Sequence, residues 1–133
     1  MPVQHARHIG IGIDRPVEEV YAFLAEPANF PQWAEGLGHS FVHVEGMTWR
    51  AETPTGPMRV LFSEPNNHGV LDHAVIPEHG PAMHNPMRVV ANGDGAELVF
   101  TLFQREGVSD DEMARDAAMV SRELAALKAL LER

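Results

Sequence analysis

Few residues of this chain have side chains that could do chemistry, and histidine is the most frequent of them. The sequence has eight histidines and no cysteine, so thiolate zinc sites, iron–sulfur clusters and cysteine nucleophiles are excluded. His79 and His84 lie in a proline-rich loop, where they could meet around a metal ion together with Glu78. Solvated loop histidines are the simpler interpretation, and we expect no metal site.

Among the eight histidines, His73 is the one that the strand pattern favours as facing the interior. Neighbouring residues of a strand project to opposite sides of the sheet, so Asp72 and His73 are poorly placed to act as an acid–base dyad. Leu71, His73 and Val75 share one face of a strand predicted over residues 68–76. The opposite face of this strand is also fairly apolar, so either face could point into the interior. The face with His73 is favoured as the inward one. An inward His73 would be an ionisable group in an apolar cavity, more often structural than catalytic.

Other catalytic and cofactor motifs are missing. Residues 10–12 lack the third glycine of a dinucleotide-binding fingerprint, and the chain has no phosphate-binding loop with lysine and no Gly-x-Ser-x-Gly elbow. We therefore expect no cofactor. A cofactor-free mechanism would use His73 or His84 as general acid or base, and Arg88 or Arg59 would stabilise the developing negative charge.

Composition and charge limit the partners. The chain has 19 acidic and 10 basic residues and a formal charge of −9, which repels phosphate backbones and anionic lipid surfaces. Because the basic residues are scattered singly, we expect no nucleic-acid partner. The start of the chain lacks the apolar stretch of a secretory signal, and no run approaches the roughly 18 apolar residues of a membrane span. We therefore expect a cytoplasmic protein without a membrane span.

The elements that would position these side chains begin with a strand and two short helices. Residues 3–13 end in isoleucines that alternate with glycines, which favours a strand with one packed face. Asp14 and Pro16 suit a helix start, Asp14 as the capping side chain, and residues 17–24 carry apolar side chains at helical spacing. Prolines then end that helix, and we expect a second brief helical turn before Gly36.

Six antiparallel strands and a long helix are expected in the rest of the chain. Short segments with alternating apolar residues are separated by turn formers between Ser40 and Arg105. The residues from Ser109 to Glu112 read as a capping box that starts the last helix. Because no repeat or change of composition divides the chain, residues 1–133 are predicted to form one domain. Apolar side chains recur along the helix at steps of four and three and should face the sheet: Met113, Ala117, Val120, Leu124, Leu127 and Leu131.

The inward faces of these elements predict an apolar cavity. A long helix across a curved sheet leaves a space where the two diverge, and ligand sites are lined mainly by apolar and aromatic side chains. Plain core packing is the simpler interpretation of each position. The predicted ligand-binding residues are Trp49, Met58, Val60, Phe62, Leu71, Phe100, Leu102, Met113, Ala117 and Val120.

The element order and the local sequence resemble the SRPBCC superfamily, which includes START-like and Bet v 1-like proteins. Residues 13–24, followed by residues 27–30 and Trp33, are similar to the opening of bacterial SRPBCC proteins of the polyketide cyclase/dehydrase and lipid-transport type. Residues 97–103, 107–112 and 124–132 are similar to the close of the same proteins. The resemblance covers essentially the whole chain.

The resemblance implies the helix-grip fold of the α+β class. In that fold a seven-stranded curved antiparallel sheet surrounds a long C-terminal helix, and two short helices follow the first strand. It also implies an apolar cavity between sheet and helix, entered near the loops and the short helices. Residues 69–73 look like a segment of one bacterial branch, but no cyclase-type catalytic set matches residue by residue.

Three functions follow as hypotheses. The first is binding of a small hydrophobic or amphipathic molecule, such as a lipid, in the cavity. The second is a cofactor-free enzyme of the cyclase, dehydratase or isomerase type. The third is a non-catalytic homodimeric interaction domain whose interior is filled by its own side chains.

Overall fold

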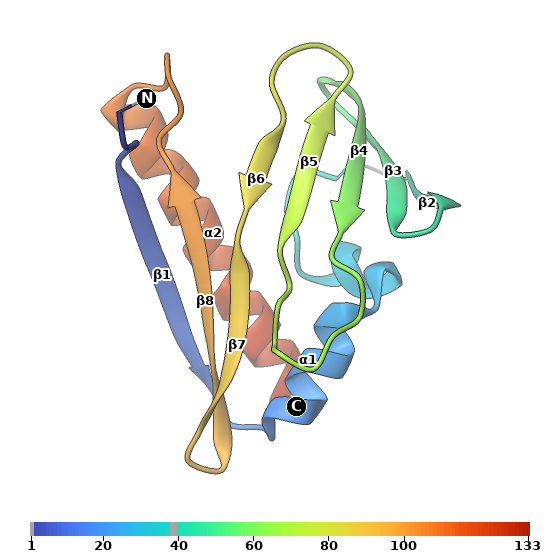
Figure 1. Cartoon of the computed structure of the whole chain (residues 1–133), viewed down its shortest axis with the longest axis vertical. Helices are drawn as coiled ribbons and strands as arrows, with labels where there is room; N and C mark the ends of the chain where they lie inside the picture. The colour runs from blue at the N-terminus through green and yellow to red at the C-terminus, as the bar shows by residue number, and fades with distance from the viewer. Residues whose placement is uncertain (1, 38–39) are drawn as a thin grey trace.

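The structure is a computed structural model that describes residues 2–37 and 40–133 (Figure 1). The chain begins with strand β1 (Ala6–Ile13), helix α1 (Val17–Ala25) and the short 3-10 helix η1 (Pro27–Gln32). The strands that follow are β2 (Ser40–Glu45), β3 (Thr48–Thr53), β4 (Gly56–Phe62), β5 (His73–Pro77), β6 (Met83–Asn85), β7 (Met87–Asn92) and β8 (Gly95–Phe103). Helix α2 (Asp110–Leu131) ends the chain.

The strands form two antiparallel sheets that together make one curved wall. The first has the order β1-β8-β7 and the second the order β2-β3-β4-β5-β6. The described residues therefore hold eight strands where the sequence predicts seven. The extra strand arises at Pro86, which has no N–H to donate to a ladder. On either side of Pro86, β6 pairs with β5 and β7 pairs with β8.

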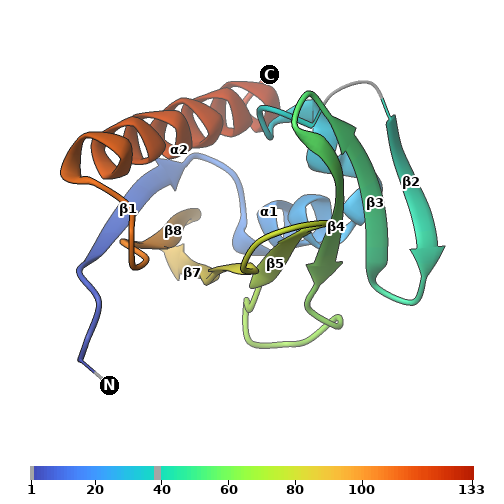
Figure 2. The same ribbon diagram turned by 90° about the horizontal axis from the view of Figure 1, so that it is seen from above.

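Both α-helices lie on the inner side of this wall. Figure 2 shows the strands following a curve from β1 to β2, with α1 and α2 on its concave side. Helix α2 packs against β1, and α1 packs against β7 and β8. The predicted stripe of α2 is buried from Met113 to Leu127, which is fully enclosed at 0% exposure. Burying a side chain of this size contributes about 1.5–3 kcal/mol.

The start of α2 confirms the predicted cap, whereas the start of α1 does not. Ser109 Oγ accepts a hydrogen bond from the backbone N–H of Glu112 at 3.1 Å. The prediction that Asp14 caps α1 is wrong, because Pro16 is the N-cap residue and no side chain caps this end. The backbone N–H of Asp14 instead donates to Glu132 Oε2 at 2.7 Å, which ties the end of β1 to the end of α2.

The segment predicted as one strand over residues 68–76 is divided in two. Val70 forms an isolated bridge with Arg88, and the regular strand β5 begins only at His73. The bend comes from Gly69, which has a φ of +69° and lies against a backbone carbonyl oxygen of β7. A Cβ at this position would overlap that oxygen, so the turn requires glycine.

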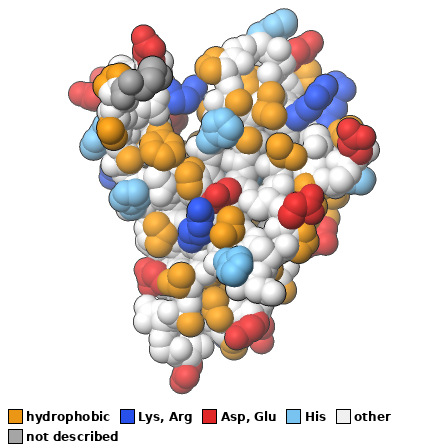
Figure 3. All heavy atoms as spheres, viewed as in Figure 1, with side chains coloured by type: hydrophobic (Ala, Val, Ile, Leu, Met, Phe, Trp, Pro, Cys, Tyr) orange, Lys and Arg blue, Asp and Glu red, His pale blue; other side chains and the backbone are white. Residues whose placement is uncertain are grey.

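The outer surface mixes apolar and charged side chains. Figure 3 shows hydrophobic and charged groups interspersed over one face, with Lys and Arg at separate places. In residues 2–37 and 40–133, no helix is long and apolar enough to cross a membrane. The exposed large apolar residues are Val3, Val42, Val44, Leu61, Ile76, Val90 and Phe103.

Candidate functional site

A cavity of about 830 Å³ lies between the sheets, η1 and the first half of α2. Ligand pockets commonly measure about 300–1,000 Å³, so this volume suits a small molecule. Its apolar wall consists mainly of aromatic and aliphatic side chains: Phe30, Trp33, Leu37, Met58, Val75, Met83, Phe100, Leu102, Met119 and Val120.

The cavity occupies one end of the curved wall because α1 fills the other. Val20 and Leu24 of α1 are 0% and 7% exposed and belong to the main hydrophobic core. On β8, Leu98 and Phe100 both belong to that core, but of the two only Phe100 lines the cavity, together with Leu102. The lining thus includes the end of β8 and the first half of α2, and the end of β8 and the start of α2 lie at the top of Figure 1.

Helix α2 presents two neighbouring rows of side chains. The row predicted from the sequence, from Met113 to Leu127, is buried. A second row of Asp116, Met119 and Glu123 lines the cavity, and Val120 belongs to both rows. Residues three or four apart lie on one helix face, so the second row is visible in the sequence as a more polar stripe beside the apolar one.

The structure brings only part of the predicted ligand-binding set to the cavity. Met58, Phe100, Leu102 and Val120 line it. Trp49 is outside, where its ring stacks on Phe41 with centroids 4.9 Å apart. The other predicted residues outside the lining are Val60, Phe62, Leu71, Met113 and Ala117.

His73 lies on the cavity wall, with its side chain inward as favoured by the sequence. The residue is 7% exposed. Its imidazole contacts the rings of Phe30 and Phe100, with centroid distances of 5.4 Å and 6.0 Å. Burial lowers the pKa of His73 to about 4, against smaller opposing effects of the Leu71 carbonyl and the Asp72 charge. His73 is therefore neutral at pH 7.

The hydrogen bonds of His73 use both ring nitrogens. Nδ1 lies 3.4 Å from the Leu71 carbonyl oxygen, which can only accept. Nε2 lies 3.5 Å from the Asn85 amide nitrogen, which can only donate. A neutral imidazole with its proton on Nδ1 satisfies both contacts, so the surroundings select one tautomer.

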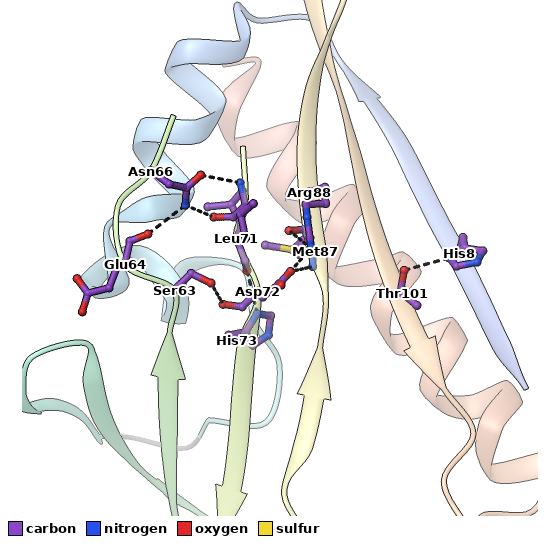
Figure 4. Close-up of polar contacts among 11 residues, drawn as sticks. His8, Ser63, Glu64, Asn66, Leu71, Asp72, His73, Met87, Arg88 and Thr101 are labelled. Atoms are coloured by element: carbon purple, nitrogen blue, oxygen red, sulfur yellow. Dashed lines mark hydrogen bonds and ion pairs between the residues drawn. The ribbon is translucent and has the colours of Figure 1, made fainter. Parts of the chain in front are cut away.

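The other predicted catalytic residues do not converge with His73. Arg88 is outside the cavity lining and forms an ion pair with Asp72, as Figure 4 shows. The reason is the alternation of β7, in which Met87 and Val89 are buried and Arg88 is exposed. His84 borders the cavity but is exposed, opposite Ala74 in the ladder. The structure thus does not assemble the predicted acid–base set.

Glu123 is a buried ionisable residue of the cavity that is not among the predicted site residues. It is 8% exposed, and its Oε2 accepts a hydrogen bond from the backbone N–H of Glu35 at 2.7 Å. Burial raises the pKa of Glu123 to about 7, although the Glu35 N–H and the Arg122 charge work in the opposite direction. The sequence signal for Glu123 is an acidic residue adjoining the apolar stripe of α2.

Polar side chains surround the apolar wall. Gln4, Glu35, Arg105, Glu106 and Asp116 contribute to the lining, together with Asn85. Across the described ranges, no group of three or more His, Cys, Asp or Glu side chains is arranged to hold a metal ion. The arrangement is an apolar space with a polar rim, which suits an amphipathic guest better than a metal centre.

Comparisons with known proteins place the fold. No family model and no curated protein matches this chain. A START superfamily protein from Mycobacterium smegmatis is 15% identical over 96% of this chain and 97% of its own, with a TM-score of 0.74. Ara h 8.0201 is 12% identical over 97% and 99% of the two chains, with a TM-score of 0.68.

A third similar structure is that of DynU16, a protein from the dynemicin biosynthetic locus. It is 17% identical over 96% of this chain, with a TM-score of 0.73, and this chain spans 47% of its length. Likeness at this level of identity concerns the fold and not the activity. The chain has the helix-grip fold of START-like and Bet v 1-like proteins, as the sequence resemblance implies.

Proposed function

We propose that this protein binds a small hydrophobic or amphipathic molecule in the cavity between the sheets and α2. The observation that carries the proposal is a space of about 830 Å³ walled mainly by aromatic and aliphatic side chains. An unfilled apolar space forfeits dispersion contacts along its whole lining. A guest of matching shape restores these contacts and removes its own apolar surface from water.

The competing hypotheses lose support from the same geometry. Arg88 and Arg59 are both exposed and outside the cavity lining. The two residues predicted to stabilise developing negative charge in an enzyme therefore do not reach the cavity. An interaction domain with a filled interior would not have a space of about 830 Å³. A homodimer and a cytoplasmic location stay predictions, because both are compatible with a ligand-binding domain.

Native mass spectrometry of freshly purified protein, compared with its denatured mass, is the first test. We expect a mass difference from a bound small molecule, and the same spectrum counts the subunits. Delipidated protein should then bind the neutral apolar dye N-phenyl-1-naphthylamine, whose emission rises in an apolar site. Trp33 lines the cavity and Trp49 does not, so Trp33 emission should change on binding.

A pair of variants on α2 distinguishes the cavity from the surface. Met119→Trp places a large ring in the cavity lining and should reduce dye binding at least severalfold. Ala118→Trp makes the same addition at the exposed neighbouring position and should leave binding unchanged. Equal dye binding by both variants, or no binding by the wild-type protein, would contradict the proposed function.

A further inference from the structure

The cavity contains a buried carboxyl group with one oxygen available to a guest. Glu123 is 8% exposed, and its Oε2 is occupied by the backbone N–H of Glu35 at 2.7 Å. No residue in the described ranges donates a hydrogen bond to Oε1. Those ranges also contain no fully enclosed side-chain nitrogen or oxygen without a partner. Oε1 is therefore accessible, and since Glu123 lines the cavity, the access is from the cavity side.

The charges around this oxygen are mostly negative. Glu35, Glu106, Asp116 and Glu123 line the cavity, and Arg105 is the single Lys or Arg among the lining residues that the structure describes. Arg122, the neighbour of Glu123 in sequence, is held by the Glu35 carboxylate, with Nε 3.2 Å from Oε2. Acidic groups beside low-dielectric walls focus a negative potential into the space between them.

His73 does not supply a positive charge to balance Glu123. Its two ring nitrogens are engaged by the Leu71 carbonyl and the Asn85 amide, and its ring lies among Phe30, Phe62 and Phe100. In the described residues no ion pair joins Glu123 to Arg105 or to any other basic side chain, so a guest can supply the cation for the ionised form of Glu123. Burying a carboxylate without a partner is costly, and a charge-assisted hydrogen bond offsets that cost.

We propose that the ligand is an apolar amine whose ammonium group donates a hydrogen bond to Glu123 Oε1 while its apolar body lies against the aromatic wall. This inference rests on the proposed function and adds the chemical class of the guest. The ammonium takes the place of the missing cation, and the rings of Phe30 and Phe100 contact the hydrocarbon part. Neutral and anionic amphiphiles of the same size have no positive charge to pair with the ionised form of Glu123.

The test is a headgroup series with a constant tail. Octylamine, octan-1-ol and octanoate are titrated into the wild-type protein by isothermal calorimetry at about pH 8, where a primary amine with a pKa near that of lysine, about 10.4, is protonated. Glu123 is ionised at that pH, above its pKa of about 7. We expect octylamine to bind about tenfold or more tightly than octanol, because hydrogen bonds to charged groups exceed neutral ones. Octanoate should bind most weakly.

Two glutamine variants locate the preference. Glu123→Gln should weaken octylamine binding far more than octanol binding, so that the preference for the amine is lost. Glu112→Gln makes the same change of charge on α2 at an exposed position outside the lining and should keep the preference for the amine. Far-UV circular dichroism checks that both variants fold. The wild-type series needs no variant, so it remains decisive if Glu123→Gln is unfolded.

The possible results separate the two proposals. Equal binding of the three wild-type ligands, or tighter binding of octanoate, would overturn the amine inference and leave cavity binding intact. An amine preference that survives in Glu123→Gln would overturn the role of Glu123. If none of the three binds and the dye does not bind either, the proposed function itself fails.

Discussion

Replacing Glu123 with glutamine should reveal a pH dependence of stability that the wild-type protein conceals. Burial lowers the pKa of His73 from 6.5 to about 4. Burial raises the pKa of Glu123 from 4.5 to about 7. Both shifts make the free energy of unfolding depend on pH over nearly the same window, but in opposite directions.

The sign for each residue follows from which state holds the proton. Between pH 6.5 and about 4 the unfolded chain protonates His73 and the folded chain does not, so the free energy of unfolding falls as the pH falls. Between pH 4.5 and about 7 the folded chain keeps the Glu123 proton that the unfolded chain releases. The contribution of Glu123 is therefore lost as the pH rises.

The two effects are similar in size. One pKa unit corresponds to about 1.36 kcal/mol, so each shift is worth about 3 kcal/mol across its window. In the wild-type protein they nearly cancel between pH 4.5 and 6.5. Glu123→Gln removes one of them, and the variant should lose about 3 kcal/mol relative to wild type between pH 7 and pH 4.5.

Urea unfolding followed by circular dichroism at half-unit steps of pH measures this difference. The difference between variant and wild type removes the titration of all the other carboxylates, which both proteins share. Ala118→Gln changes no ionisable group at an exposed position of the same helix, so it is the control and should give a difference that does not vary with pH. Parallel curves for Glu123→Gln and wild type from pH 4.5 to 7 would refute the reasoning.

Three further predictions concern the fold. Gly69→Ala should lower the free energy of unfolding by more than about 2 kcal/mol, because its Cβ would overlap a backbone carbonyl oxygen. Gly107 has a similar φ but open space around the position of a Cβ, so Gly107→Ala should cost only about 1 kcal/mol. Urea unfolding measures both. Ser109→Ala should lower the free energy of unfolding by about 1 kcal/mol through loss of the α2 cap, and an unchanged melting temperature would count against the cap. Leu127→Ala should cost about 2–5 kcal/mol, and Met119→Ala should cost much less in the same thermal melts, because Met119 already borders open space.

Much of the fold follows from local signals that the tertiary structure does not override. The cap at Ser109 and the apolar stripe of α2 are encoded within the helix itself, and the structure has both. The division at Pro86 and the bend at Gly69 depend on which strand lies alongside, and a strand pattern by itself does not specify its partner. The outward direction of Arg88 was available from the alternation of its apolar neighbours in β7.

The cavity is harder to predict than the sheet. The alternation of a strand shows which face of the sheet a residue lies on, but not whether the space opposite that residue is filled. Met58 and Val60 both face inward on β4, yet Met58 lines the cavity and Val60 is in the core. The two residues differ in their position along β4, and what lies opposite each position is determined only by folding. Glu123 is missed for a related reason. An acidic residue beside an apolar helix stripe is usually solvated, and only the space that it faces turns this one into a buried carboxyl.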